Sequence, residues 1–436
     1  MATYLKKTSK KIEETESKTR DIVKGILNRI RSQKESAVRE LAAKFDNWTR
    51  DFVLSKEEIE ALIDMVPQTA KDDIRFAYDQ IFGFALKQRE SMKAFETELL
   101  PGVTLGQRLV PCQCAGCYVP GGRFAHAASA IMSVATAKSA GVPLVVACTP
   151  PRGDSINPTV AYALSLSGAD VIMALGGVQA IGCMAFGLFT GTPADIIVGP
   201  GNAYVAEAKR VLFGEIGIDV FAGPTESLII ADQTADPMIV AVDLVSQCEH
   251  GYDSPVWLLT DSKKLGEKVI EIISKVIADL PDPEVAAFSW NNHGEVVLCK
   301  DREELAKIND AYAAEHVQVI AEDLDWYLEN LKNYGSLFLG EGCTVSYGDK
   351  TSGTNHILPT KRAARYSGGL NVGKFIKILT YQKLTKEANR TIGAVASRIS
   401  RYEGMEGHAR AADIRLRKYF PGETFDYEVY DQKSYI

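Results

Sequence analysis

The chain has 436 residues, 46% of them hydrophobic and 24% charged, with a formal net charge of -7. This length allows two or more domains with large cores, and the charge balance gives no reason to expect nucleic acid or an anionic membrane as a partner. No run approaches eighteen apolar residues, and the first residues, MATYLKKTSKKIEETE, lack the apolar core of a signal peptide. Eight scattered cysteines do not resemble a secreted disulfide framework, so we expect a cytoplasmic protein.

The first ninety residues are predicted to be mainly helical. Apolar residues recur at helical spacing over residues 9–47, and a second helical stretch covers residues 56–92. The segment 100–117 is expected to be extended and rich in turns, with Pro101-Gly102 as a break.

Beyond residue 118, predicted strands and helices alternate in two series. The strands of the two series are expected at 143–149, 170–175, 195–202 and 218–224, and then at 226–232, 254–260, 295–299 and 317–323. Strands that alternate with helices of ten to fifteen residues predict parallel, doubly wound α/β sheets.

The predicted fold class is therefore α/β, with two doubly wound, Rossmann-like parallel-sheet domains, a helical N-terminal segment and a C-terminal helical arm. The expected parts are a helical arm at 1–22, a first α/β domain from 23–117 and 226–370, a second at 118–225, and the C-terminal arm at 371–436.

The segment DLVSQCEHGYD (243–253) is a candidate metal site. It continues an apolar-periodic run, so we expect a helix that ends at Gly251 and carries Gln247 and His250 on one face. An amide oxygen and an imidazole at this spacing can bind a divalent metal, although such a pair more often marks an ordinary helix surface.

Histidines limit the candidates for proton transfer. The chain contains His126, His250, His293, His316, His356 and His408. Glu315-His316 falls between a predicted helix and a predicted strand, where a carboxylate and an imidazole can act on different atoms of one substrate. Asp349 and His356 lie in the turn-rich stretch GDKTSGTNH (348–356), where a carboxylate either binds a metal or caps the loop.

Two short motifs suggest cofactor sites less strongly. The GPGN turn (199–202) opens a predicted helix and could face a phosphate, with Asp219 on a ribose hydroxyl, but Tyr204 breaks the G-x-G-x-x-G pattern and an ordinary glycine turn is favoured. CQCAGC (112–117) lacks a fourth metal ligand, which favours buried thiols over a zinc or iron–sulfur site.

Taken together, the chain resembles the histidinol dehydrogenase family from about Ile22 to Arg417. The matching stretches, in chain order, are YVPGG (118–122), GGVQAI (176–181), GPGNAYVAEAKR (199–210), AGPTE (222–226), SQCEHG (246–251), AEH (314–316), GDKTSGTNHILPT (348–360) and EGMEGHA (403–409).

The resemblance implies a four-electron oxidation of a primary alcohol to a carboxylate through a bound aldehyde, with NAD as cofactor. His316 is then the general base and Glu315 the group that activates water. It also implies one Zn²⁺ per subunit and an intertwined homodimer, because one metal ligand comes from the partner's C-terminal arm. The implied zinc ligands are Gln247, His250, Asp349 and, from the partner, His408.

The resemblance also carries binding residues. NAD-contacting positions match Tyr118, Gln179 and Asn202. Substrate-pocket positions match Thr225 (where the family usually has Ser), His316, His356 and Glu403.

Three stretches, YLKK (4–7), RFAHAAS (123–129) and KRAARYSGGLNVGKF (361–375), are similar to the sulfopropanediol dehydrogenase branch of this family. This implies oxidation of (R)-2,3-dihydroxypropane-1-sulfonate to 3-sulfolactate. Lys361, Arg362, Arg365, Arg123 and protonated His126 are the candidate partners of the sulfonate, of which Arg365 and His126 are favoured. Such cations would repel the ammonium of histidinol if they lined the pocket, whereas the alternative is that most of them are solvated surface residues. Histidinol remains the alternative substrate, since Glu403 matches the position that holds its amino group.

Two readings from other classes stay open. One is an aldehyde dehydrogenase in which Cys248, beside His250, is the nucleophile. The other is a dimeric metal-binding protein without catalytic activity. An assay for NADH formation combined with zinc analysis distinguishes them.

Overall fold

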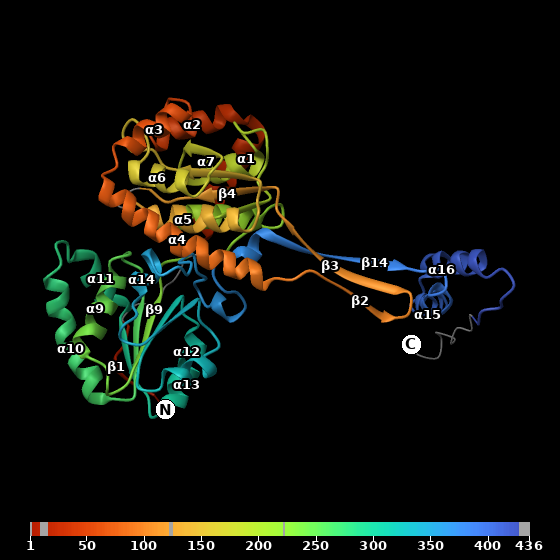
Figure 1. Cartoon of the computed structure of the whole chain (residues 1–436). Helices are drawn as coiled ribbons and strands as arrows, with labels where there is room; N and C mark the ends of the chain where they lie inside the picture. Colours follow the sequence, from red (N-terminus) through yellow and green to blue (C-terminus); the bar gives the residue numbers. More distant parts are fainter. Residues whose placement is uncertain (1, 9–15, 122–124, 221–222, 427–436) are drawn as a thin grey trace. The chain divides into compact units, whose positions relative to one another are not determined.

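The computed structural model describes residues 2–8, 16–121, 125–220 and 223–426. Contacts within the chain define two compact units, Met1–Glu90 with Pro111–Phe375, and Ser91–Val110 with Ile376–Ile436. Both sheets predicted from the alternation of strands and helices lie in the first unit, which confirms the α/β fold class (Figure 1).

The first sheet has six strands in the order β1-β11-β10-β9-β12-β13. Neighbouring strands pair in parallel except β1, which runs antiparallel to β11. The strands are β1 (Thr3–Lys6), β9 (Ser227–Ala231), β10 (Val256–Thr260), β11 (Glu295–Leu298), β12 (His316–Ile320) and β13 (Ser336–Leu339).

Helices cover both faces of this sheet because successive side chains of its strands point to opposite sides. Ile229 of β9 packs into a core with α9 (Pro237–Cys248), α10 (Lys263–Ala278) and α11 (Glu284–His293). Its neighbour Leu228 packs into a second core with α12 (Arg302–Tyr312) and α13 (Leu324–Asn330). A short helix, α14 (Val345–Lys350), follows β13.

The second sheet is parallel throughout, in the order β6-β5-β4-β7-β8. Its strands are β4 (Cys114–Tyr118), β5 (Leu144–Thr149), β6 (Val171–Ala174), β7 (Ile196–Val198) and β8 (Gly217–Ile218). The connecting helices are α5 (Ala127–Ser139), α6 (Pro158–Leu166), α7 (Gly177–Phe186) and α8 (Ala203–Leu212). Each strand leads into a helix or turn at the carboxyl edge of the sheet.

The N-terminal helices belong with the second sheet. They are α1 (Glu16–Gln33), α2 (Glu35–Phe45), α3 (Lys56–Asp64) and α4 (Gln68–Ser91). α1 packs on α7 and α8, and α3 packs on α6.

The second unit combines a sheet in the order β14-β3-β2 with two helices. Its elements are β2 (Phe95–Leu100), β3 (Val103–Pro111), β14 (Ile376–Leu384), α15 (Asn389–Tyr402) and α16 (Glu406–Tyr419). α15 and α16 pack on each other, with Arg401 bound to Asp413 at 2.7 Å.

The expected domain boundaries differ from the structure in three places. Within 1–22, the described residues Thr3–Lys6 form a strand, and the Lys6 ammonium donates to the carbonyls of Trp290 (2.8 Å) and Gly294 (2.6 Å). Residues 23–117 contribute helices and the central strand β4 to the second sheet rather than to the 226–370 domain. The arm at 371–436 includes the strand β14, which shares a sheet with residues 95–111.

The three cysteines of CQCAGC are buried, as the sequence predicts. None of the helices in the described ranges is long and apolar enough to cross a membrane. A cytoplasmic location stays a prediction.

Candidate active site

Glu315 and His316 stand at the amino edge of the first sheet, where β12 begins beside β9. The backbone of Glu226, immediately before β9, connects them: its N–H donates to the Glu315 carboxylate (3.0 Å), and its carbonyl accepts from the His316 N–H (3.1 Å). The parallel register of β9 and β12 therefore brings the three residues together. Both Glu315 and His316 are buried.

The ring of His316 has one occupied and one available nitrogen. Nδ1 lies 3.3 Å from the carbonyl oxygen of Glu226, which can only accept, so Nδ1 carries the proton. Nε2 is buried, and among the described residues it has no hydrogen-bond partner. When the ring is neutral, it presents the lone pair of Nε2, the atom that a general base uses.

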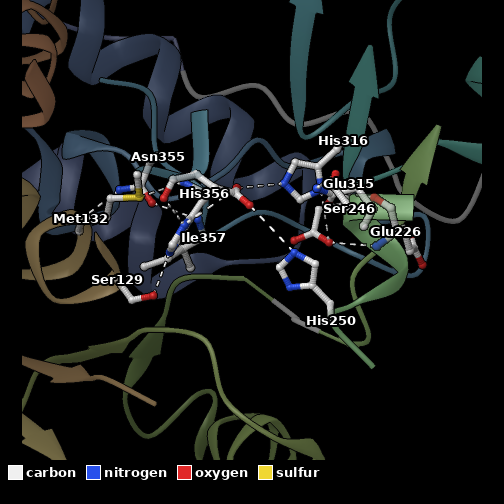
Figure 2. A network of polar contacts seen from close by, with 12 residues as sticks. Ser129, Met132, Glu226, Ser246, His250, Glu315, His316, Asn355, His356 and Ile357 are labelled. Atoms are coloured by element: carbon white, nitrogen blue, oxygen red, sulfur yellow. Dashed lines mark hydrogen bonds and ion pairs between the residues drawn. The ribbon is translucent and has the colours of Figure 1, made fainter. Parts of the chain in front are cut away.

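Asp349, near the end of α14, lies among three imidazoles. Figure 2 labels these rings, which belong to His250, His316 and His356. Its carboxylate oxygens are 3.6 Å from His316 Nε2, 3.9 Å from His356 Nδ1 and 4.0 Å from His250 Nε2. Burial opposes its ionisation, but the neighbouring His316 outweighs burial and lowers the pKa of Asp349 to about 2. Asp349 is therefore a carboxylate at neutral pH, not a loop cap.

The pKa values of Glu315 and His316, the candidate acid–base pair, are both raised. Burial raises the pKa of the Glu315 carboxyl to about 8. Burial works against a charged imidazole at His316, but the Glu315 and Asp349 carboxylates prevail and raise the pKa of His316 to about 9. Both groups consequently exchange protons near neutral pH, as proton-transferring residues should.

Gln247 and His250 lie at the carboxyl end of α9. The helix ends at Cys248 rather than Gly251, because the chain turns here to enter β10, so His250 sits in the turn and does not share a helical face with Gln247. Even so, His250 reaches Asp349. Gln247 remains on the last turn of α9, three residues before His250 in the chain.

These residues fit a divalent cation. The buried Oε1 of Gln247 has no hydrogen-bond partner in the described part of the chain, and such an orphaned oxygen costs on the order of 1–3 kcal/mol unless something binds it. Amide oxygen, imidazole and carboxylate donors suit a borderline cation such as Zn²⁺. Within the described ranges, no group of three or more His, Cys, Asp or Glu side chains is arranged to hold a metal, and His250 and Asp349 supply two such side chains here.

Asp243 ties together the elements that carry these residues. It lies on α9, and its carboxylate accepts from Gln318 of β12 (2.7 Å) and from Thr344, the residue before α14 (3.0 Å). One carboxylate thus links the helix of Gln247, the strand of His316 and the helix of Asp349.

His356 has both ring nitrogens engaged. Nδ1 donates to the backbone carbonyl of Asp349 (3.0 Å), so Nε2 accepts from the Ser129 hydroxyl (2.8 Å). Its backbone N–H points at Met132 Sδ, and Asn355 donates to the Met132 carbonyl (2.9 Å), which holds the loop on α5 (Figure 2). Burial lowers the pKa of His356 to about 4, so the ring is neutral at physiological pH.

Glu226, Ser129 and Asp243 were not singled out as functional from the sequence. Glu226 is part of the matching stretch AGPTE, yet no local pattern shows that its carboxylate accepts from the Lys361 N–H (2.8 Å) or that its pKa is raised to about 7 by burial. Only the pairing of distant strands reveals these contacts.

The residues predicted to bind NAD lie at the carboxyl edge of the second sheet. The Tyr118 hydroxyl, at the end of β4, accepts from the Gly177 N–H (3.2 Å) at the start of α7. Gln179, on the same helix, donates to Asp46 (2.8 Å). Asn202 is exposed, and its side chain caps α8.

Asp219 does not take the role suggested by its spacing from the GPGN turn. Its carboxylate is fully buried and accepts from the Gly199 N–H (2.7 Å) and from the Lys209 ammonium (2.6 Å). A carboxylate engaged in this way is not available to a ribose hydroxyl, so that interpretation is wrong.

The other predicted residues fall into two groups. Thr225 and His126 are partly buried in the first unit, His126 directly before α5, whereas Arg365 is exposed. His408 and Glu403 are exposed in the second unit.

Cys248 is a poor nucleophile. Its side chain is completely buried, and burial raises its pKa to about 11, so the reactive thiolate is scarce at neutral pH. This environment weighs against a thiohemiacetal mechanism.

Comparison with known proteins agrees with the geometry. A family model described as histidinol dehydrogenase matches residues 9–416. The chain is 55% identical over 426 residues to a sulfopropanediol 3-dehydrogenase of Ruegeria pomeroyi, covering 97% of this chain and 98% of that protein. It is also 55% identical over 421 residues to a histidinol dehydrogenase homolog of Pelagibacter ubique, covering 96% and 98%. The crystal structure of histidinol dehydrogenase from Elizabethkingia anophelis superposes with a TM-score of 0.88 at 33% identity, covering 95% of this chain and 94% of that one.

Proposed function

The chain is a dehydrogenase of the histidinol dehydrogenase family, and we propose that it oxidises (R)-2,3-dihydroxypropane-1-sulfonate to 3-sulfolactate with two NAD⁺. The relative named sulfopropanediol 3-dehydrogenase supports this substrate, because its identity of 55% exceeds the 33% to the histidinol dehydrogenase of known structure. The alternative is histidinol.

The proposed chemistry rests on the hydrogen bonding of the two ring nitrogens of His316. Its Nδ1 is held by the Glu226 carbonyl, and its buried Nε2 has no partner among the described residues. Nε2 is therefore directed at a substrate hydroxyl, from which it takes the proton in the first oxidation. NAD⁺, when bound, accepts a hydride in each of the two oxidations.

Glu315 acts in the second half of the reaction. Before this step, His316 releases to solvent the proton that it took from the alcohol. The Glu315 carboxylate then takes a proton from water, the hydroxide adds to the aldehyde, and His316 takes the hydroxyl proton of the resulting hydrate as the second hydride passes to NAD⁺. The raised pKa of Glu315, about 8, makes the ionised carboxylate a stronger base than a solvated glutamate. Burial of both residues also keeps bulk water from the aldehyde.

We assign Gln247, His250 and Asp349 as metal ligands in the first unit, with His408 of the partner subunit as the fourth. When bound, a divalent cation anchors the alcohol and offsets the Asp349 charge that raises the pKa of His316. The exposure of His408 in the described structure of one chain leaves it available to another subunit.

We propose that an intertwined homodimer forms, with an interface on the surface of the second unit. Exposed apolar side chains on α15 recur at helical spacing, at Ile392, Val395 and Ile399, and β14 exposes Ile378 and Leu379. Exposed apolar side chains on one face of a helix are typical of a subunit interface. Neither nucleic acid nor a membrane is proposed as a partner.

The sulfonate is proposed to meet His126 and Arg365, with Thr225 and His356 lining the pocket and Tyr118, Gln179 and Asn202 around the cofactor. His126 stands at the start of α5, where unpaired helix N–H groups favour an anion. Glu403 remains a proposed substrate residue from the partner's arm.

The substrate is tested by measuring kcat/KM with NAD⁺ for the sulfonated diol, histidinol and propane-1,2-diol. We expect the sulfonated diol to be preferred by about 10-fold or more over either, with two NADH formed per carboxylate, because a charge-assisted contact contributes on the order of 1.5–3 kcal/mol.

Variants locate the anion contact. Arg365→Ala and His126→Ala should each raise KM for the sulfonated diol, whereas Arg362→Ala, an exposed arginine of the same loop, is the matched control. Equal kcat/KM for histidinol and the sulfonated diol would overturn the substrate assignment without affecting the family.

A further inference from the structure

The second sheet contains a buried ion pair that the chemistry above does not use. Lys209 of α8 and Asp219, just after β8, lie 2.6 Å apart, and their side chains are 2% and 0% exposed. Taking two charges out of water is costly, and well-packed neutral residues often give equal stability. Stability alone is therefore a weak reason for such a pair.

Both charges act on one backbone residue. Asp219 accepts from the Gly199 N–H (2.7 Å), while the Lys209 ammonium donates to the Gly199 carbonyl (2.8 Å). The pair thus satisfies both polar groups of the first residue of the turn 199–202. This turn leads from β7 into α8.

Gly199 is held in a conformation that requires glycine. Its φ is +118°, and a Cβ there would lie 1.9 Å from the carbonyl oxygen of Tyr118. The turn therefore packs directly on the backbone of the residue that ends β4. Glycine is conformationally permissive, so without external contacts this segment would sample other shapes.

We infer that the Lys209–Asp219 pair is a positioning device for the cofactor site, holding the turn 199–202 in its binding shape before NAD⁺ arrives. The inference rests on the proposed function, in which Tyr118 and Asn202 contact NAD⁺. Neither Lys209 nor Asp219 touches the cofactor. They act through Gly199, which fixes the start of the turn that ends in Asn202 and packs against Tyr118.

Preorganisation gives the pair a measurable signature. A turn that is already in place loses little conformational entropy when the cofactor binds. Loosening it should weaken NADH and NAD⁺ binding while leaving Glu315 and His316, which are built on the other sheet, unchanged.

The test is the neutral double variant Lys209→Met/Asp219→Asn, which keeps side-chain volume and leaves no unpaired buried charge. We expect its dissociation constant for NADH and its KM for NAD⁺ to rise about 10-fold, since small misplacements at a binding site have effects of this order. Its thermal midpoint, KM for the alcohol and kcat at saturating NAD⁺ should stay near those of the unmodified enzyme.

The chain provides a matched control at the opposite edge of the same sheet. Lys138 and Asp170 also lie 2.6 Å apart; Asp170 accepts from the Val145 N–H (2.7 Å), and Lys138 donates to the Pro143 carbonyl (3.2 Å). Lys138→Met/Asp170→Asn removes the same chemistry and should leave NADH binding unchanged.

A measurement without substitution completes the test. Backbone N–H groups of residues 199–205 should resist hydrogen exchange equally with and without NAD⁺; rapid exchange that slows only on binding would overturn the inference. So would NADH affinity in the Lys209→Met/Asp219→Asn variant equal to that of the unmodified enzyme. If the unmodified enzyme itself bound no NADH, the proposed function would fail instead.

Discussion

The first sheet gathers polar residues at the amino ends of its strands, and the second sheet gathers them at the carboxyl ends. In the second sheet, Tyr118 and Gly199 follow the carboxyl ends of strands, as ligand-binding residues of open α/β sheets usually do. In the first sheet, His316 begins its strand and Glu226 precedes the neighbouring strand, so the proposed catalytic cluster stands at the amino edge.

Helix ends explain what each edge suits. The carboxyl edge of the second sheet gathers the amino ends of α7 and α8, whose free N–H groups favour the phosphates of a dinucleotide. The amino edge of the first sheet receives the carboxyl end of α9, whose carbonyls favour a cation. The order of strands and helices alone thus favours an anion at the carboxyl edge of the second sheet and a cation at the amino edge of the first.

The edges also differ in how completely their buried groups are paired. Lys209, Asp219 and Gly199 satisfy one another, whereas Gln247 Oε1 and His316 Nε2 have no hydrogen-bond partner in the described ranges. Paired groups hold a shape, and unpaired groups are available to a ligand. This contrast separates scaffold from chemistry without reference to any relative.

Removal of the metal should produce the largest effect. Exhaustive chelation is expected to abolish alcohol oxidation, because Gln247, His250 and Asp349 then anchor nothing, and Zn²⁺ should restore it. NADH binding, followed by fluorescence, should survive because it belongs to the other edge. Undiminished turnover after chelation would refute the assignment of the amino edge.

The next effect concerns the base. His316→Ala should lower kcat by roughly 10²–10⁴, the usual contribution of a positioned general base. Cys248→Ala should keep most activity, because that thiol is buried with its pKa raised to about 11. Steady-state rates of NADH formation measure both, and the opposite order would support a thiol nucleophile.

The smallest effect is a shift in pH dependence. Glu315 must be ionised to take a proton from water, so oxidation of the aldehyde should rise as pH passes through its pKa of about 8. The Glu226 charge contributes to raising that pKa, so Glu226→Gln should move the rise to lower pH. An unmoved midpoint would mean that Glu226 acts only through its backbone.

The control for this variant is Glu329→Gln, on the exposed side of α13. It removes an equal charge from an exposed side chain that is not among the groups shifting the pKa of Glu315, and it should leave the pH profile of aldehyde oxidation unchanged.

The sequence predicts the parallel strands well for a physical reason. Strands buried on both faces read as continuous apolar runs, as in LVVACT (144–149) and SLIIA (227–231). This pattern does not predict β1 or β14, because β1 is four residues long and β14 is largely exposed. Their partners also lie far away in the chain, where no local pattern points.

The residues of the candidate site also differ in how far the sequence predicts them. Local motifs and family resemblance identify Glu315, His316 and Asp349, but the contact of Glu226 with both catalytic residues depends on the register between β9 and β12. Asp219 shows that a correct spacing can also mislead. Its spacing from the glycine turn is correct for a ribose contact, and spacing cannot show that Lys209 occupies the carboxylate.

The short strand β1 has a practical consequence for handling the protein. By lying antiparallel on β11, it makes the edge of the sheet a four-residue strand whose register shifts between Tyr4 and Lys6, and a short, irregular edge is a poorer template for pairing with other molecules than β11 would be. Lys6 fastens it through the carbonyls of Trp290 and Gly294. A preparation trimmed by protease within its first eight residues should therefore be more prone to aggregate, even with the catalytic cluster intact.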